Sequence, residues 1–142
     1  MLSATAVVLC ALELLGRPVS TVVPIKFLDS PPAGVSRNAE AFVVRNPPTI
    51  YLITSTQTFR DAMRVRQMYD DLDPFRKIAS IIVHEEWHLT HGPDEQGAYL
   101  AQLTTLGALG AAGPMVTSVR RSMQVAVAEQ KRRRPELLIA KQ

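Results

Sequence analysis

The sequence is poor in cysteine, since Cys10 is the only one among 142 residues. A single cysteine excludes an intrachain disulfide framework and fits a reducing compartment. The sequence also lacks a transmembrane segment, because the apolar stretch at residues 1–15 is too short to cross a bilayer and contains Glu13. It contains no internal repeat. These absences leave a cytoplasmic globular protein as the expectation.

The N-terminal stretch also lacks the marks of a secretory signal. No lysine or arginine precedes its apolar residues, and no small-residue cleavage site follows them. The apolar residues instead recur at near-helical spacing, and Gly16-Arg17-Pro18 ends the pattern. We therefore expect a core-packing helix at about residues 3–15. The alternative is a cleaved signal on a secreted protein.

Length and composition indicate an ordinary globular chain. A length of 142 residues predicts one domain, residues 1–142. The composition is typical of such a domain, with 46% hydrophobic and 20% charged residues. The net charge of +3 is uneven, because the run Lys131–Arg134 supplies much of it. Such a run can bind nucleic acid or anionic lipid, and that hypothesis predicts salt-sensitive binding lost on deletion of residues 131–142. We instead expect a solvated helix end and no nucleic-acid partner.

Hydrophobic periodicity predicts one helix, three strands and four further helices. Residues 22–28, 41–44 and 49–54 predict strands, with Arg45-Asn46-Pro47-Pro48 as a hairpin turn. Helices are expected from a Ser55-Thr56 cap to Tyr69, from an Asp73 cap to Gly92-Pro93, from an Asp94 cap to about residue 109, and at about 115–133. This order predicts a small α+β domain with a three-stranded sheet.

The stretch from Ile81 to Glu95 contains the pattern His84-Glu85-x-x-His88. Residues four apart lie one turn apart on the same face of a helix, so both imidazoles can reach one metal ion. Glu85 borders that face, where it can act on a metal-bound water without being a ligand. This is the arrangement of a zinc hydrolase with two histidine ligands and a glutamate general base.

A third ligand is expected nearby, because zinc hydrolases typically use three protein ligands. His91 lies on a neighbouring face of the same helix. Asp94 has the spacing of a metzincin-type ligand, but that pattern has glycine at position 91. Glu95 follows the Gly92-Pro93 break, and a helix packed back on the first would turn its carboxylate onto the metal. We favour Glu95 over the other two.

Glu95 begins the run Glu95-x-x-Ala98-Tyr99, and here the sequence resembles the gluzincins. These are zincin metallopeptidases in which H-E-x-x-H is followed by a glutamate ligand on a second helix, often as E-x-x-A. The short separation of the two motifs is most similar to the compact minigluzincin type. The resemblance implies a zincin-like fold in which His84, His88 and Glu95 bind Zn²⁺. It also implies that Glu85 is the catalytic base.

The resemblance further implies a strand along the rim of the cleft that pairs with an extended peptide substrate, and residues 49–54 are our candidate. The expected function is a zinc metallopeptidase that hydrolyses a protein or peptide through a metal-activated water. Tyr99, one turn after Glu95, and His91 are candidates for stabilising the oxyanion. The alternative function is a catalytically idle zinc-binding domain with a binding or regulatory role.

Two neighbours of the motif complete the expectations. Glu86 occupies a position that is usually uncharged in this class, and because it points away from the histidine face we expect it to be solvated. The ligating histidines need hydrogen-bond acceptors, and Asp94 is our candidate for one of them.

Overall fold

The computed structural model describes residues 1–17, 23–65 and 71–133, and its elements follow the predicted order. They are α1 (Ala4–Leu14), β1 (Ile25–Leu28), β2 (Ala41–Arg45), β3 (Pro48–Ile53), α2 (Gln57–Arg64), α3 (Asp73–His91), α4 (Glu95–Leu109) and α5 (Gly113–Arg133). The α+β class and the small three-stranded sheet are therefore confirmed.

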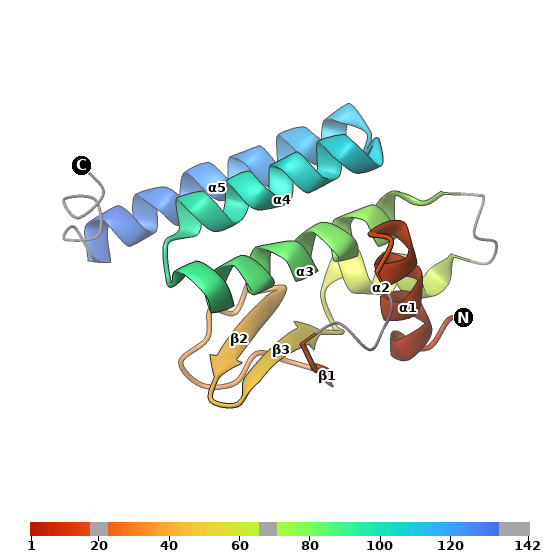
Figure 1. Ribbon diagram of the computed structural model, residues 1–142, viewed down its shortest axis with the longest axis horizontal. Coiled ribbons are helices and arrows are strands. Elements are labelled where there is room, and N and C mark those ends of the chain that lie inside the picture. Colours follow the sequence, from red (N-terminus) through yellow and green to blue (C-terminus); the bar gives the residue numbers. More distant parts are fainter. Residues whose placement is uncertain (18–22, 66–70, 134–142) are drawn as a thin grey trace.

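Helix α3 lies at the centre of the fold (Figure 1). It packs against β2 and β3 on one side and against α4 on another, while α1 and α2 lie near its N-terminal end. Helix α5 runs antiparallel to α4 and packs on it, so these two helices form the layer farthest from the sheet. The element that carries the H-E-x-x-H pattern is thus enclosed by most of the others.

The hydrophobic core lies between α3, α1, α2 and the sheet. Alternate residues of β3, Ile50 and Leu52, face the core, as the period of two in a strand requires. The core also contains these buried residues: Val7, Val8, Ala11, Leu12, Phe59, Ala62, Phe75, Ile78, Ala79, Ile81 and Ile82. The expectation of an N-terminal core-packing helix is confirmed, since Val7 and Ala11 are fully buried.

The sheet has the strand order β1-β3-β2. β3 pairs parallel with β1 and antiparallel with β2, and the predicted hairpin between β2 and β3 is confirmed. Because β3 is central, both of its edges are hydrogen-bonded to neighbouring strands. The prediction that residues 49–54 pair with a substrate peptide is therefore wrong. Among the described residues, the unpaired edge beside α3 belongs to β2.

Several predicted boundaries differ from the observed ones. β1 begins at Ile25, because Pro24 has no N–H for the ladder, and Val22 lies outside the described residues. α2 ends at Arg64, since Val65 is extended with ψ of 122°; the predicted continuation to Tyr69 lies outside the described residues. α4 ends at Leu109 as predicted, and α5 begins at Gly113, slightly before the predicted start at about residue 115.

The start of α3 also differs from the prediction. Asp73 is its first helical residue and Leu72 the cap, so the predicted Asp73 cap is wrong by one residue. The Leu72 carbonyl accepts a hydrogen bond from the Arg76 N–H at 2.9 Å, and the Asp73 carboxylate pairs with the Arg76 guanidinium at 2.8 Å in place of capping the helix. The predicted caps Thr56 and Asp94 are confirmed.

Across the described ranges, the helices are too short or too polar to span a lipid bilayer.

Candidate metal centre

Two consecutive helices position the candidate ligands. α3 carries His84 and His88 one turn apart and ends at Gly92, whose φ of 104° favours glycine. The Asp94 carboxylate then accepts a hydrogen bond from the Gly97 N–H at 3.0 Å and begins α4. Because α4 returns alongside α3, Glu95 in its first turn reaches both histidines.

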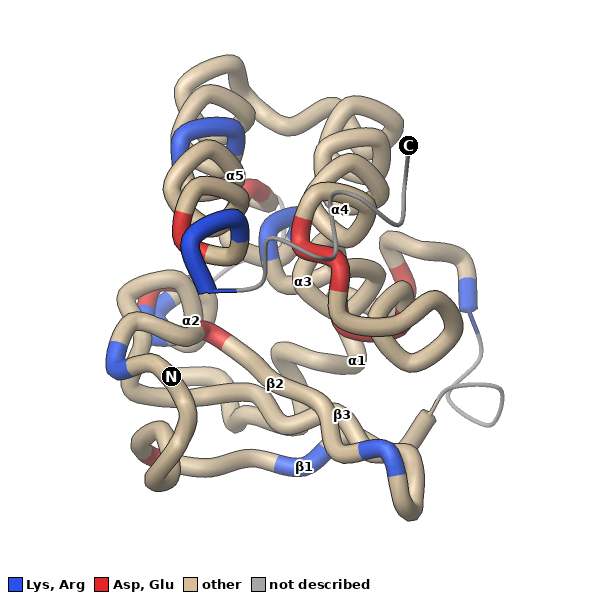
Figure 2. Tube along the Cα trace, turned by 90° about the vertical axis from the view of Figure 1, so that its left-hand side faces the viewer, with Lys and Arg blue, Asp and Glu red and all other residues tan. Residues whose placement is uncertain are grey.

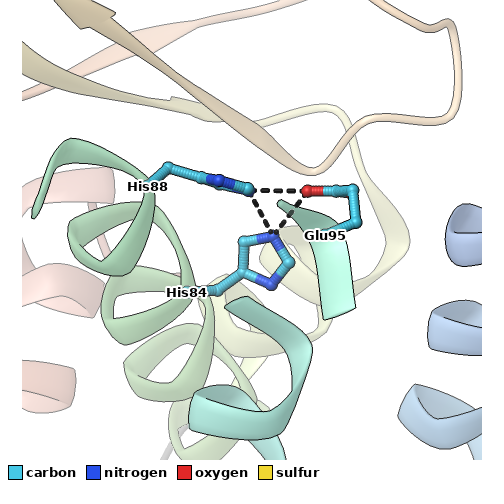
Figure 3. A group of neighbouring side chains, drawn as sticks. All are labelled: His84, His88 and Glu95. Atoms are coloured by element: carbon cyan, nitrogen blue, oxygen red, sulfur yellow. Dashed lines mark hydrogen bonds and ion pairs between the residues drawn. The ribbon is translucent and has the colours of Figure 1, made fainter. Parts of the chain in front are cut away.

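The three side chains converge on one point (Figure 3). Glu95 Oε1 lies 2.6 Å from His88 Nε2 and 3.6 Å from His84 Nε2, and the two Nε2 atoms are 3.2 Å apart. Ligand atoms at 2.0–2.1 Å from a tetrahedral ion lie about 3.3 Å from one another. The separations of 3.2 Å and 3.6 Å are close to this value, and the hydrogen-bonded separation of 2.6 Å is shorter, so the three atoms could take three corners of a tetrahedral site after a small adjustment. Two imidazoles and a carboxylate suit zinc and also other divalent transition metals.

A buried hydrogen-bond chain fixes the tautomer of His84. The Ser80 hydroxyl donates to the Lys77 carbonyl at 2.7 Å, so its oxygen accepts from Gln102 Nε2 at 3.2 Å. Gln102 Oε1 therefore faces His84 and accepts a hydrogen bond from its Nδ1–H at 2.8 Å. With the proton on Nδ1, the lone pair of neutral His84 is on Nε2, which points at the candidate site.

His88 is oriented in the same way by the end of its own helix. Its Nδ1–H donates to the Gly92 carbonyl at 2.8 Å, which also leaves Nε2 as the nitrogen available to a metal. The acceptors of the two histidines are thus Gln102 and Gly92. The suggestion of Asp94 for this role is wrong, because its carboxylate caps α4 instead.

Glu85 is buried beside the three candidate ligands. It is 6% exposed, and its carboxylate lies 4.0 Å from His84 Nε2. Burial raises the pKa of the Glu85 carboxyl and Glu95 raises it further, while His84 and His88 act in the opposite direction. A carboxylate with a raised pKa accepts a proton more readily near neutral pH, as a general base must.

His88 and Glu95 form a charged pair in the metal-free protein. Burial raises the pKa of Glu95, but its interactions with the imidazoles of His84 and His88 outweigh burial and lower this pKa from 4.5 to about 2. Burial lowers the pKa of His88, but the hydrogen bonds with Glu95 and Gly92 outweigh it and raise this pKa above 6.5. A proton on His88 Nε2 would therefore compete with a metal ion for the same nitrogen lone pair.

The Tyr99 ring lies edge-on to the His84 ring, with 4.5 Å between the ring centroids. Burial raises the pKa of the Tyr99 hydroxyl, and the carboxylates of Glu95, Glu40 and Glu85 raise it further. The phenol therefore stays protonated at neutral pH and remains a hydrogen-bond donor next to the site. The sequence suggestion that Tyr99 belongs to the site is consistent with this position.

The other candidate ligands lie elsewhere. His91 is exposed, stacks on Trp87 with 4.5 Å between ring centroids, and has its Nδ1 3.2 Å from the Trp87 carbonyl oxygen. Neither His91 nor Asp94 belongs to the cluster of possible ligands found among the described residues.

The expectation that Glu86 is solvated is wrong, because Arg17 Nη1 lies 2.6 Å from Glu86 Oε2 in a half-buried ion pair.

Sequence reasoning missed the residues that support the candidate ligand His84, namely Ser80 and Gln102. Gln102 follows Glu95 by seven residues, two turns of α4, so a polar residue on the ligand-bearing face was a usable signal.

No protein-family model, no curated protein and no solved structure matches this chain.

Proposed function

We propose that residues 1–142 form one zinc-dependent metallopeptidase domain of the gluzincin type, with a zincin-like fold. The observation that carries the proposal is the convergence of His84 Nε2, His88 Nε2 and a Glu95 carboxylate oxygen on one point. The buried carboxylate of Glu85 beside that point supplies the general base that a hydrolase needs. The lone Cys10 supports a cytoplasmic location.

His84, His88 and Glu95 are the residues that would hold Zn²⁺ in this proposal. Zinc bound there would supply a Lewis acid that lowers the pKa of water and polarises the scissile carbonyl. Glu85 takes the proton from the attacking water and passes it to the leaving amine. Tyr99 donates its hydroxyl hydrogen bond to the oxygen on which negative charge develops.

The edge of β2 is the proposed place for an extended substrate. Arg45, the last residue of β2, donates a hydrogen bond from Nη2 to the His88 carbonyl at 3.1 Å and so ties the strand to α3 beside the second ligand. A peptide that adds to β2 as a further strand would make main-chain hydrogen bonds close to the site. The substrate is then a protein or peptide in extended conformation.

Two measurements test the proposal. The purified protein, its Glu95→Ala and His88→Ala variants and a His91→Ala control are dialysed against Zn²⁺ and analysed for metal. We expect one ion in the wild type and in His91→Ala, and loss of high-affinity binding in the other two. An unchanged zinc content in Glu95→Ala contradicts the assigned third ligand.

The second measurement compares wild type and Glu85→Gln on a library of extended peptides. We expect hydrolysis by the wild type, and a loss of at least about 100-fold in turnover in Glu85→Gln at unchanged zinc content, because general base catalysis contributes about 10²–10⁴-fold. A zinc-loaded wild type that cleaves no peptide contradicts the peptidase proposal and favours a catalytically idle zinc-binding domain.

A further inference from the structure

The side chain of Gln130 makes two hydrogen bonds to the segment that carries Glu95. Its Oε1 accepts from the Glu95 N–H at 2.9 Å, and its Nε2 donates to the Pro93 carbonyl at 2.7 Å. We call this pair of bonds the Gln130 bridge. An amide side chain carries a donor and an acceptor together, so it binds a backbone carbonyl and an N–H two residues apart at the same time.

We propose that Gln130 is a positioning residue for Glu95, and that α5 is therefore a third structural component of the metal centre. The inference rests on the proposed metal centre and adds a residue 35 positions away in the sequence from the ligand that it positions. Gln130 contacts the backbone of residues 93–95. It would affect metal binding only by setting the position of Glu95.

Glu95 is the candidate ligand whose position depends most on its backbone. Hydrogen bonds from Nδ1 hold the rings of His84 and His88, whose side chains are 9% and 11% exposed. The Glu95 side chain is 28% exposed and lies in the first turn of α4, where the leading N–H groups have no partner inside the helix. The Gln130 bridge gives the first of these N–H groups a partner and restrains the turn.

The position of Gln130 follows from the packing of α5 on α4. Val116, Val119, Met123 and Val127 recur every three or four residues, and Gln130 continues this series on the same face. Val119 is buried, and α5, the helix that carries this series, packs against α4. Figure 2 shows the resulting arrangement, in which the last described turn of α5 lies beside the start of α4.

The test compares Gln130→Met with Gln124→Met. Methionine keeps the length of glutamine and removes both hydrogen bonds. Gln124 is an exposed residue of the same helix, so its variant controls for the change in composition of α5. Equal thermal unfolding of the two variants shows that α5 still packs in Gln130→Met.

The first readout uses the Co²⁺-loaded protein, whose visible absorption bands report ligand geometry without any substrate. We expect altered bands in Gln130→Met and a Co²⁺ affinity about 10–100-fold lower, the usual effect of removing a partner behind a ligand. Gln124→Met should match the wild type. In a Glu95→Ala background, Gln130→Met should cause no further loss, because it acts through Glu95.

The second readout is hydrogen exchange at the Glu95 amide in the metal-free protein. We expect this amide to exchange faster in Gln130→Met than in Gln124→Met, because its acceptor is gone. This measurement needs no metal, so it tests the bridge even if the wild type binds no Co²⁺, a result that would contradict the metal centre itself. The inference would be overturned if Gln130→Met showed both the Glu95 amide exchange rate and the Co²⁺ absorption bands of the wild type. It would also be overturned if Gln130→Met lowered the Co²⁺ affinity as much in the Glu95→Ala background as in the wild type.

Discussion

The indole ring of Trp87 occupies the space that a side chain at position 97 would need. A Cβ added to Gly97 would clash with Trp87 Cζ2, far inside van der Waals contact. Trp87 also stacks on His91, so its ring is packed on both helices of the site. Because Gly97 has no side chain, α3 and α4 approach closely at this point. Gly97 follows Glu95, the candidate ligand contributed by α4, by two residues.

We predict that Gly97→Ala destabilises the protein and weakens metal binding. The added methyl group must displace the indole or α4, and overpacking of this kind typically costs about 1–3 kcal/mol. Urea unfolding of the metal-free protein measures the stability, and a Zn²⁺ competition titration measures the affinity.

Gly107→Ala is the matched control for this prediction. Gly107 lies in the same helix, and a Cβ there would meet no atom within 4 Å. Alanine should stabilise that position by about 0.5–1 kcal/mol, since glycine is unfavourable inside helices. If both variants are stabilised alike, the packing of Trp87 on Gly97 does not set the distance between the helices.

We predict that Gln102→Leu lowers metal affinity about 10–100-fold, because His84 loses the acceptor that fixes its tautomer. In the metal-free protein, the ¹⁵N chemical shifts of the His84 ring should change from a single Nδ1–H tautomer to a mixture. Gln96→Leu, at an exposed position of the same helix, is the control. An unchanged His84 tautomer in Gln102→Leu would contradict the prediction.

The His88–Glu95 pair predicts a pH window for the metal-free protein. The lowered pKa of Glu95 contributes stability that is complete above pH 4.5 and is lost as the pH falls toward about 2. The raised pKa of His88 contributes stability that is complete below pH 6.5 and is lost as the pH rises through its value in the folded protein. The pair therefore stabilises most between these limits.

Glu95→Gln should remove this contribution. Between about pH 4.5 and 6.5 we expect a loss of roughly 1.5–3 kcal/mol, the range for hydrogen bonds to charged groups. The loss should shrink at pH 8.5 and at pH 2.5, and urea unfolding in EDTA at the three pH values measures it. A difference independent of pH would show that the pair is uncharged in the folded state.

Tyr99→Phe keeps the ring that contacts His84 and removes the hydroxyl. If the hydroxyl stabilises developing charge, kcat should fall about 10²–10³-fold, as for the loss of one oxyanion donor. Zinc content and KM should stay near the wild-type values. Equal kcat in the two proteins would assign Tyr99 to packing against His84.

Much of the fold was predictable because it depends on local signals. Apolar periodicity located α3, the caps Thr56 and Asp94 located the starts of α2 and α4, and Gly92 located the end of α3. The four-residue spacing of His84 and His88 and the break before Glu95 are also local features. They were sufficient to select the three side chains that converge.

The rest depends on contacts between residues distant in sequence. The place of β3 in the middle of the sheet results from pairing with both β1 and β2, and the sequence of residues 49–54 is compatible with an edge strand as well. Glu86 meets Arg17 across 69 residues, and Gln130 meets Glu95 across 35. The sequence shows that Glu86 and Gln130 are polar but does not indicate which distant residue each of them meets.

The separation of Glu95 and Gln130 has a consequence for protein synthesis. The proposed ligands and base all lie within residues 84–95, so the entropy lost in bringing them together is small. Gln130 is added to the chain 35 residues after Glu95. A nascent chain therefore acquires all of its proposed metal donors before the residue that we propose positions one of them is added. The site would tighten only when α5 is complete and docks on α4.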